Sequence, residues 1–167
     1  MRDHLRRTAL KGAGLASVGA LAALMPSQAW AIERPNEQDD PTGGWDVTGM
    51  IAGRPPFKFF IVLTKGGGVL RSGQNDLRPT SLASPSYGSW AKLEEERQFG
   101  ITVLNFRYSA SGDLIGTTKI SVRATLNHAG DRFSGRATTQ LLDLNGNPTA
   151  TLPGTVDAVR IKVELPE

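Results

Sequence analysis

Residues 118–127 read Thr-Lys-Ile-Ser-Val-Arg-Ala-Thr-Leu-Asn, with an apolar side chain at almost every second position. A period of two residues is typical of a β-strand with one buried face, because successive side chains of a strand point to opposite faces. Residues 131–142 repeat the pattern, and residues 154–165 repeat it again. The faces that we expect to point inward are Thr118, Ile120, Val122, Ala124 and Leu126, then Phe133, Gly135, Ala137, Thr139 and Leu141, then Val159, Ile161, Val163 and Leu165.

Short turns separate these stretches from others of the same kind. Gly66-Gly67-Gly68, Ser111-Gly112-Asp113 and Asn145-Gly146 each lie between strand-like runs, and Asn-Gly is the strongest short hairpin signal. The runs 57–64 and 99–108 are apolar on both faces, so we expect their outer side to be partly covered. The expected strands are 44–52, 57–64, 68–73, 88–94, 98–108, 115–127, 131–142 and 154–165, with a short extra piece near 147–152.

Eight or nine sequential strands joined by tight turns predict an all-β fold. We expect an antiparallel up-and-down barrel of about eight strands, because a sheet that closes on itself has no exposed edge. A barrel of this size has an interior just wide enough for a filling of side chains or for one small ligand. The alternative is a two-sheet β-sandwich, whose longer crossover the irregular stretch 72–88 could supply.

A tryptophan stands at the start of the first expected strand. Gly43-Gly44-Trp45 resembles the Gly-x-Trp signature of lipocalins and their calycin relatives. The resemblance implies a calycin-like barrel in which Trp45 closes the base and an arginine of the last strand, here Arg160, packs against it. Other segments resemble small exported bacterial proteins without an assigned activity: Ser84 to Trp90, Gly116-Thr117, Gly130 to Gly135, Asp143 to Asn147 and Gly154-Thr155.

The N-terminus has the three regions of an export signal. Residues 1–11 are basic, residues 12–25 are apolar, and Ala29-Trp30-Ala31 is a small-x-small cleavage site. The apolar run is shorter than the roughly 20 residues that cross a bilayer, so we expect no stable membrane anchor.

The basic region also indicates an export route. Leu5-Arg6-Arg7-Thr8-Ala9-Leu10-Lys11 resembles the twin-arginine motif, which implies the twin-arginine export machinery and a signal peptidase as partners. We therefore expect residues 1–31 to be a signal peptide, 32–43 a flexible arm and 44–167 a single barrel domain. The expected destination is the periplasm or the medium.

Charge and residue supply exclude several functions. The formal charge is +3, but the first 31 residues hold four of the 19 basic residues and one of the 16 acidic ones, so the remainder is neutral. A neutral body gives no electrostatic reason to bind nucleic acid. The chain has no cysteine, and His128, expected in an exposed turn, is the only histidine after residue 31. We therefore expect no disulfide, no metal site, no Ser-His-Asp triad and no cofactor.

Two sets of residues stand out as candidate sites. Aromatic side chains give a pocket both apolar surface and polar handles, and we expect residues 84–90 to fold over one mouth of the barrel. The ligand-binding candidates are Phe59, Tyr87, Trp90, Phe106 and Tyr108. Asp157 falls on the expected inner face of 154–165, where a carboxylate needs a partner such as Arg107 or Arg123. If the protein is an enzyme, the catalytic candidates are Asp157, Arg107 and Tyr108.

The leading hypothesis is an exported, non-enzymatic barrel that binds a small, mostly apolar molecule. One alternative is a cofactor-independent isomerase, cyclase or lyase that uses the barrel pocket. Another is a filled barrel with a structural or interaction role. The interior of the barrel discriminates among these three hypotheses. An apolar cavity favours ligand binding, and a buried Asp–Arg–Tyr set favours an enzyme. A filled interior favours a structural or interaction role.

Overall fold

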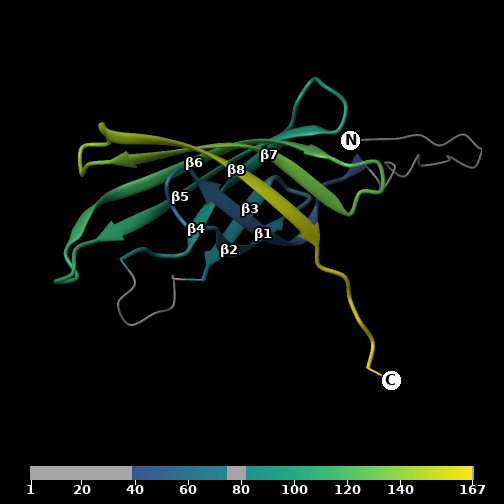
Figure 1. Cartoon of the computed structure of the whole chain (residues 1–167), viewed down its shortest axis with the longest axis horizontal. Helices are drawn as coiled ribbons and strands as arrows, with labels where there is room; N and C mark the ends of the chain where they lie inside the picture. The colour runs from purple at the N-terminus through teal and green to yellow at the C-terminus, as the bar shows by residue number, and fades with distance from the viewer. Residues whose placement is uncertain (1–38, 75–81, 167) are drawn as a thin grey trace, which may run out of the picture. The chain divides into compact units, whose positions relative to one another are not determined.

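The computed structural model describes residues 39–74 and 82–166 of the 167-residue chain. Eight strands follow one another in these ranges: β1 (Gly43–Ile51), β2 (Phe57–Leu63), β3 (Gly68–Gly73), β4 (Ser86–Lys92), β5 (Gln98–Tyr108), β6 (Leu114–Leu126), β7 (Arg132–Leu142) and β8 (Pro148–Arg160). Each pairs antiparallel with the next, and β8 pairs with β1, so the sheet closes into an up-and-down barrel (Figure 1). The predicted barrel is confirmed, and the sandwich alternative is wrong. Within the described residues, no helix is long and apolar enough to cross a bilayer.

Alternation of side chains fills the barrel as expected for most strands. Ala124 and Leu126 of β6 and Phe133 of β7 are buried, as the expected inward faces of these strands require. The buried core consists of Trp45, Val47, Phe59, Ile61, Leu63, Val69, Phe99, Ile101, Val103, Ala124, Leu126, Phe133, Val156 and Ala158. Every strand except β4 contributes a residue to this core, and Trp90 of β4 packs against it.

The last strand differs from the prediction in its face and in its bounds. Val156 and Ala158 are buried, whereas Val159 is 45% exposed, so the inward face is the opposite of the one expected. Ala158 pairs with Val47 on one side and with Phe133 on the other, where the large neighbours leave room for only a small side chain. The bulkier series Val159, Ile161, Val163 and Leu165 suggested the wrong face, and its last three members lie beyond the strand. The expected extra piece near 147–152 is the first half of β8.

Strand β4 approaches β5 closely because it carries a glycine on its inner face. Gly88 pairs with Val69 of β3 and Val103 of β5. A Cβ at this position would lie 1.9 Å from the backbone oxygen of Thr102, so no larger residue fits without moving a strand.

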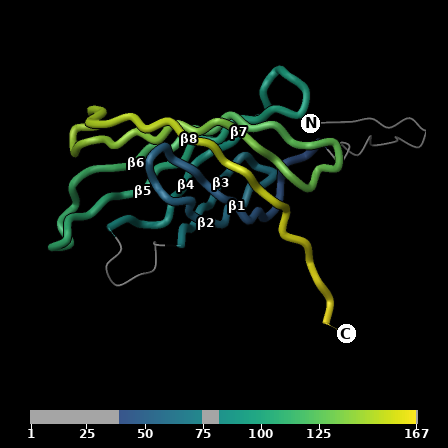
Figure 2. Tube along the Cα trace, viewed as in Figure 1, coloured from purple at the N-terminus to yellow at the C-terminus, as the bar shows by residue number. Residues whose placement is uncertain are grey.

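The two ends of the barrel differ. Strand β1 stops at Ile51, which pairs with Gly154, so residues 148–153 of β8 have no partner on β1 and pair with β7 alone. These six residues extend about 20 Å at the rise of a strand. The tube view shows the turns that join β5 to β6 and β7 to β8 lying well beyond β1–β4 at this end (Figure 2). The opposite end is closed by side chains.

Candidate functional site

The closed end is sealed by Trp45. Its side chain is completely buried, and its ring packs edge-on against Phe133 with centroids 4.8 Å apart. Phe133 in turn packs edge-on against Phe99 at 5.3 Å. The indole Nε1 donates a hydrogen bond of 2.9 Å to the backbone oxygen of Pro41, which anchors the segment before β1. These contacts fill this end of the barrel with side chains.

Arg160 covers the outer side of this seal. Its guanidinium lies over the Trp45 ring, 4.3 Å from the centroid, as the calycin resemblance implies. Its nitrogens donate to the backbone oxygens of Gly130, Thr42 and Asp40. Burial lowers the pKa of the Arg160 guanidinium from its ordinary value, and the charges of Asp40 and Asp131 oppose that shift. Residues 40–42 of the expected flexible arm are thus held by direct hydrogen bonds, and residues 32–38 lie outside the described residues.

The open end contains an apolar pocket. Ile51, Phe57 and Phe59 line one wall, and Ile120, Val122 and Ala137 line the other. The space inside it measures about 40 Å³. Pockets that enclose a drug-sized ligand measure about 300–1,000 Å³, so side chains fill most of the barrel and leave only a small apolar recess at this mouth.

An inner shelf continues the pocket beyond the mouth. We define the inner shelf as the inward-facing residues of β6–β8 past the end of β1: Thr118, Ile120, Thr139, Leu141, Ala150 and Leu152. Ile120 pairs with Thr139, which pairs with Leu152, and Thr118, Leu141 and Ala150 form the next row. All six are half-buried and four of them are apolar, so a largely apolar surface extends from the pocket along the projecting strands.

One arginine lies in this pocket, and the sequence analysis did not single it out. Arg71 of β3 packs its guanidinium over the Phe59 ring, 4.5 Å from the centroid, and donates to Ser86 Oγ at 3.1 Å. The sequence pattern that could have indicated its inward direction is the alternation of β3, because Arg71 follows the buried Val69 by two residues and shares its face. Arg71 places a positive charge beside a largely apolar lining.

The five predicted ligand-binding residues do not come together. Phe59 and Trp90 face the interior, whereas Tyr87 and Phe106 point outward from β4 and β5 and are more than half exposed. Tyr108 is the last residue of β5. The expected lid at 84–90 is wrong, because Ser86–Lys92 is a strand of the wall and residues 82–84 run along the edge of β5, with hydrogen bonds to Phe106 and Tyr108.

Trp90 packs against the core and does not line the apolar pocket. Its ring packs edge-on against Phe99, with centroids 6.4 Å apart, and its Nε1 donates to the backbone oxygen of Thr64 at 2.8 Å. The sequence analysis placed Trp90 both in the expected strand 88–94 and in the expected lid 84–90. The pairing of β4 with β3 and β5 agrees with the strand.

The three catalytic candidates also lie apart. Asp157 points outward because β8 has the opposite face to the expected one, and it pairs with Thr48 and Ser134. Arg107 lies near the end of β5 and pairs with Gly116 and, by an isolated bridge, with Ala83. Asp157 is therefore near the sealed end, and Arg107 and Tyr108 are near the open end.

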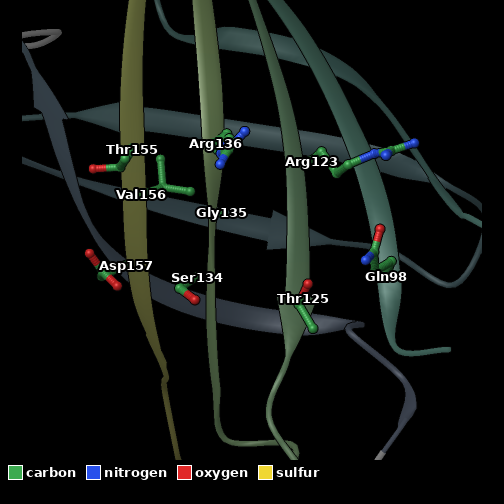
Figure 3. A pocket seen from close by; sticks show the side chains of 9 residues that line it. All are labelled: Gln98, Arg123, Thr125, Ser134, Gly135, Arg136, Thr155, Val156 and Asp157. Carbon is green, nitrogen blue, oxygen red and sulfur yellow. The ribbon is translucent and has the colours of Figure 1, made fainter. Parts of the chain in front are cut away.

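A polar groove lies beside Asp157 on the outer wall (Figure 3). Its floor is formed by β6–β8, with Thr125, Ser134 and Thr155 as hydroxyl donors. Arg123 and Arg136 pair directly across β6 and β7, and like charges in that position repel. Figure 3 shows the Arg123 side chain extending away from Arg136, toward the strand that carries Gln98. The groove is wide and open, and its two positive charges diverge.

Two aspartates stabilise turns. Asp143 Oδ1 accepts hydrogen bonds from the backbone nitrogens of Asn145 and Asn147, which lowers the pKa of the Asp143 carboxyl. A hydrogen bond from the Asn127 side chain likewise lowers the pKa of Asp131. His128 is exposed in the turn before β7, as predicted. In residues 39–74 and 82–166 no group of three His, Asp or Glu side chains could hold a metal ion.

Comparison with known proteins adds no assignment to this geometry. No protein-family model matches the sequence, and no curated protein is significantly similar to it.

Proposed function

We propose that this protein binds a small, largely apolar molecule at the open end of its barrel. The observation that supports the proposal is the apolar recess between Phe57, Phe59 and Ile120, which continues onto the inner shelf. Binding pockets are typically apolar with a few polar groups that orient the ligand, and Arg71 is such a group here. An enclosed volume of about 40 Å³ admits only one end of a molecule. The rest of the ligand lies on the inner shelf.

A neutral fluorescent probe tests the proposal. N-phenyl-1-naphthylamine brightens when it leaves water, and we expect it to bind the protein with one saturable site. Leu152→Glu introduces a charge on the inner shelf and should abolish that binding, because an unpaired carboxylate in apolar surroundings is costly. Since Leu152 is half-exposed, the fold should survive the change.

Two matched controls locate the site. Leu144→Glu makes the same change in an exposed turn, and Leu70→Glu makes it on the outer wall of β3. Both variants should bind the probe as the parent does. Loss of binding in Leu70→Glu with retention in Leu152→Glu would move the site to the outer wall and contradict the proposal. Native mass spectrometry of the protein from its own host would then identify any co-purifying molecule.

The proposal includes export through the twin-arginine route, on the evidence of Arg6, Arg7 and the Ala29–Ala31 cleavage site. The enzyme alternative loses support because Asp157, Arg107 and Tyr108 lie at different parts of the barrel. A second candidate function is a filled barrel with an interaction role. The small interior volume favours it, as do the large apolar side chains exposed on the outer wall.

A further inference from the structure

The outer wall carries a row of exposed apolar side chains. We define the outer row as Val62, Leu70, Tyr87 and Leu104, one from each of β2 to β5. Val62 pairs with Leu70, Leu70 with Tyr87, and Tyr87 with Leu104, so the four lie side by side across the sheet. They are 43–63% exposed, and the exposed Phe60 and Phe106 stand beside its two ends. A contiguous exposed apolar surface of this kind indicates an interaction site.

The C-terminal segment has a complementary pattern. Residues 161–165 read Ile-Lys-Val-Glu-Leu, and their apolar members are 51%, 91% and 84% exposed. In an extended chain these three side chains share one face while Lys162 and Glu164 share the other. Figure 1 shows this segment, in yellow, leaving the barrel after β8. We call residues 161–165 the tail.

The tail begins where the outer row ends. The backbone nitrogen of Ile161 donates to the oxygen of Gly44, and Gly44 pairs with Val62 of the row. The Ile161 side chain lies over Gly44, because a Cβ built there would be 3.6 Å from its Cδ1. The row and the tail therefore form one continuous apolar surface, half of it on the barrel and half of it projecting from it.

We propose that two copies of this chain form a symmetric dimer in which the tail of each lies across the outer row of the other. The lengths agree: the row spans three inter-strand spacings, about 14 Å, and Ile161 to Leu165 spans four residues, about 13 Å. Covering Val163 and Leu165 leaves Lys162 and Glu164 on the other face of the tail, in water. A two-fold axis repeats the contact, so each dimer buries two tails and two rows.

The chain's own tail does not cover its own row, because Val163 and Leu165 are 91% and 84% exposed. To cover it, the tail would have to turn across the strands directly after Ile161, and residues 161–165 contain no glycine, proline, asparagine, aspartate or serine for a tight turn. Nor does the row offer a free strand edge, since at the row β2 to β5 are each paired on both sides. The tail therefore packs through side chains on the face of the sheet, and the partner's tail does so without a turn.

Cysteine cross-linking tests this arrangement, because the chain has no cysteine of its own. Tyr87→Cys and Val163→Cys place thiols at the middle of the row and the middle of the tail, which meet whichever way the tail crosses. The full chain is expressed with either change alone, and the two purified proteins are mixed and oxidised. We expect a covalent dimer that joins one of each. Val163→Cys mixed with Thr151→Cys, an exposed position on β8, is the matched control and should give none.

Sedimentation velocity measures the association itself. The parent should sediment as a dimer at high concentration, and Val163→Lys with Leu165→Lys should weaken dimerisation by about tenfold or more, since each lysine removes a buried apolar side chain. Leu104→Lys should act in the same way, and Thr151→Lys should have no effect. An unchanged melting temperature in each variant would show that the barrel is intact.

Three results would overturn the proposal. The first is a parent that is monomeric at every concentration tested, and the second is a dimer that survives the two tail lysines. The third comes from one chain that carries both Tyr87→Cys and Val163→Cys: it is a disulfide that forms only within that chain and never between two chains. The last result would show that the tail folds back on its own barrel. None of these outcomes bears on binding at the inner shelf, whose test uses Leu152.

Discussion

At the scale of single residues, the sealed end depends on Trp45. The side chain is fully buried, packs on Phe133, lies under Arg160 and donates to Pro41. Trp45→Ala should lower the free energy of unfolding by about 3–5 kcal/mol, as for other buried aromatic residues. Urea unfolding monitored by circular dichroism measures the loss. Tyr87→Ala, on the exposed outer wall, should cost far less, and equal costs for the two would contradict the assigned role of Trp45.

The turn carboxylates make stability depend on pH. Hydrogen bonds lower the pKa of Asp143 below its unfolded value of about 3.9, so the ionised form stabilises the fold above that pH and the stabilisation is lost as the pH falls through the folded pKa. Asp143→Asn keeps an oxygen acceptor but removes this charge. We expect the variant to be less stable than the parent at pH 7 and the difference to shrink in acid. A difference independent of pH would show that the charge contributes nothing.

Sequence motifs predicted Trp45 and Arg160 because a paired glycine and tryptophan at a strand start is a recognisable local pattern. No motif indicated Arg71. Its inward direction follows only from its position on the same face of β3 as the buried Val69. A charged residue on a short strand of six residues gives too little alternation to fix its face.

At the scale of elements, β4 depends on a position where no side chain fits. Gly88→Ala should push β4 away from β5, because its Cβ would lie 1.9 Å from the Thr102 oxygen, and we expect a loss of about 1–3 kcal/mol or more, as for other overpacked sites. Gly66→Ala makes the same chemical change where the added Cβ would meet nothing within 4 Å. It should be neutral or stabilise by less than about 1 kcal/mol. The melting temperatures of the two variants, measured by thermal unfolding, test the prediction. Equal melting temperatures for Gly88→Ala and Gly66→Ala would contradict it.

Strand order and most strand bounds followed from period and turns, because hairpin pairing between neighbours in sequence is local. The face of β8 did not follow. Two alternating apolar series overlap there, and the smaller one, Val156 and Ala158, packs inside because Val47, Trp45 and Phe133 already occupy the space. The inward face of β8 depends on the volumes of the side chains that it meets on other strands, and the sequence of β8 alone does not contain that information.

At the scale of the whole molecule, the pattern predicted closure but not how completely the barrel is filled. Residues of β2 and β5 that are apolar on both faces suggested a covered outer side, and the described structure leaves Phe60, Val62, Leu104 and Phe106 exposed instead. A pattern records which side chains are apolar. It does not record whether a second molecule covers them.

The proposed N-terminal signal and the sealed barrel make a joint prediction. Cleavage after Ala31 would leave residues 40–42 attached, and these are the residues whose backbone oxygens hold Trp45 and Arg160. We therefore expect the exported form to begin at Ile32 and to be as stable as the full chain, which mass spectrometry and urea unfolding can establish.

Arg6→Lys with Arg7→Lys should stop export, because the twin-arginine receptor distinguishes guanidinium pairs from amines of equal charge. Replacing Arg2 by lysine instead is the matched control and should leave export intact. Undiminished export of the double variant would assign the protein to the general secretion route, in which the chain crosses the membrane unfolded and the barrel closes only afterwards.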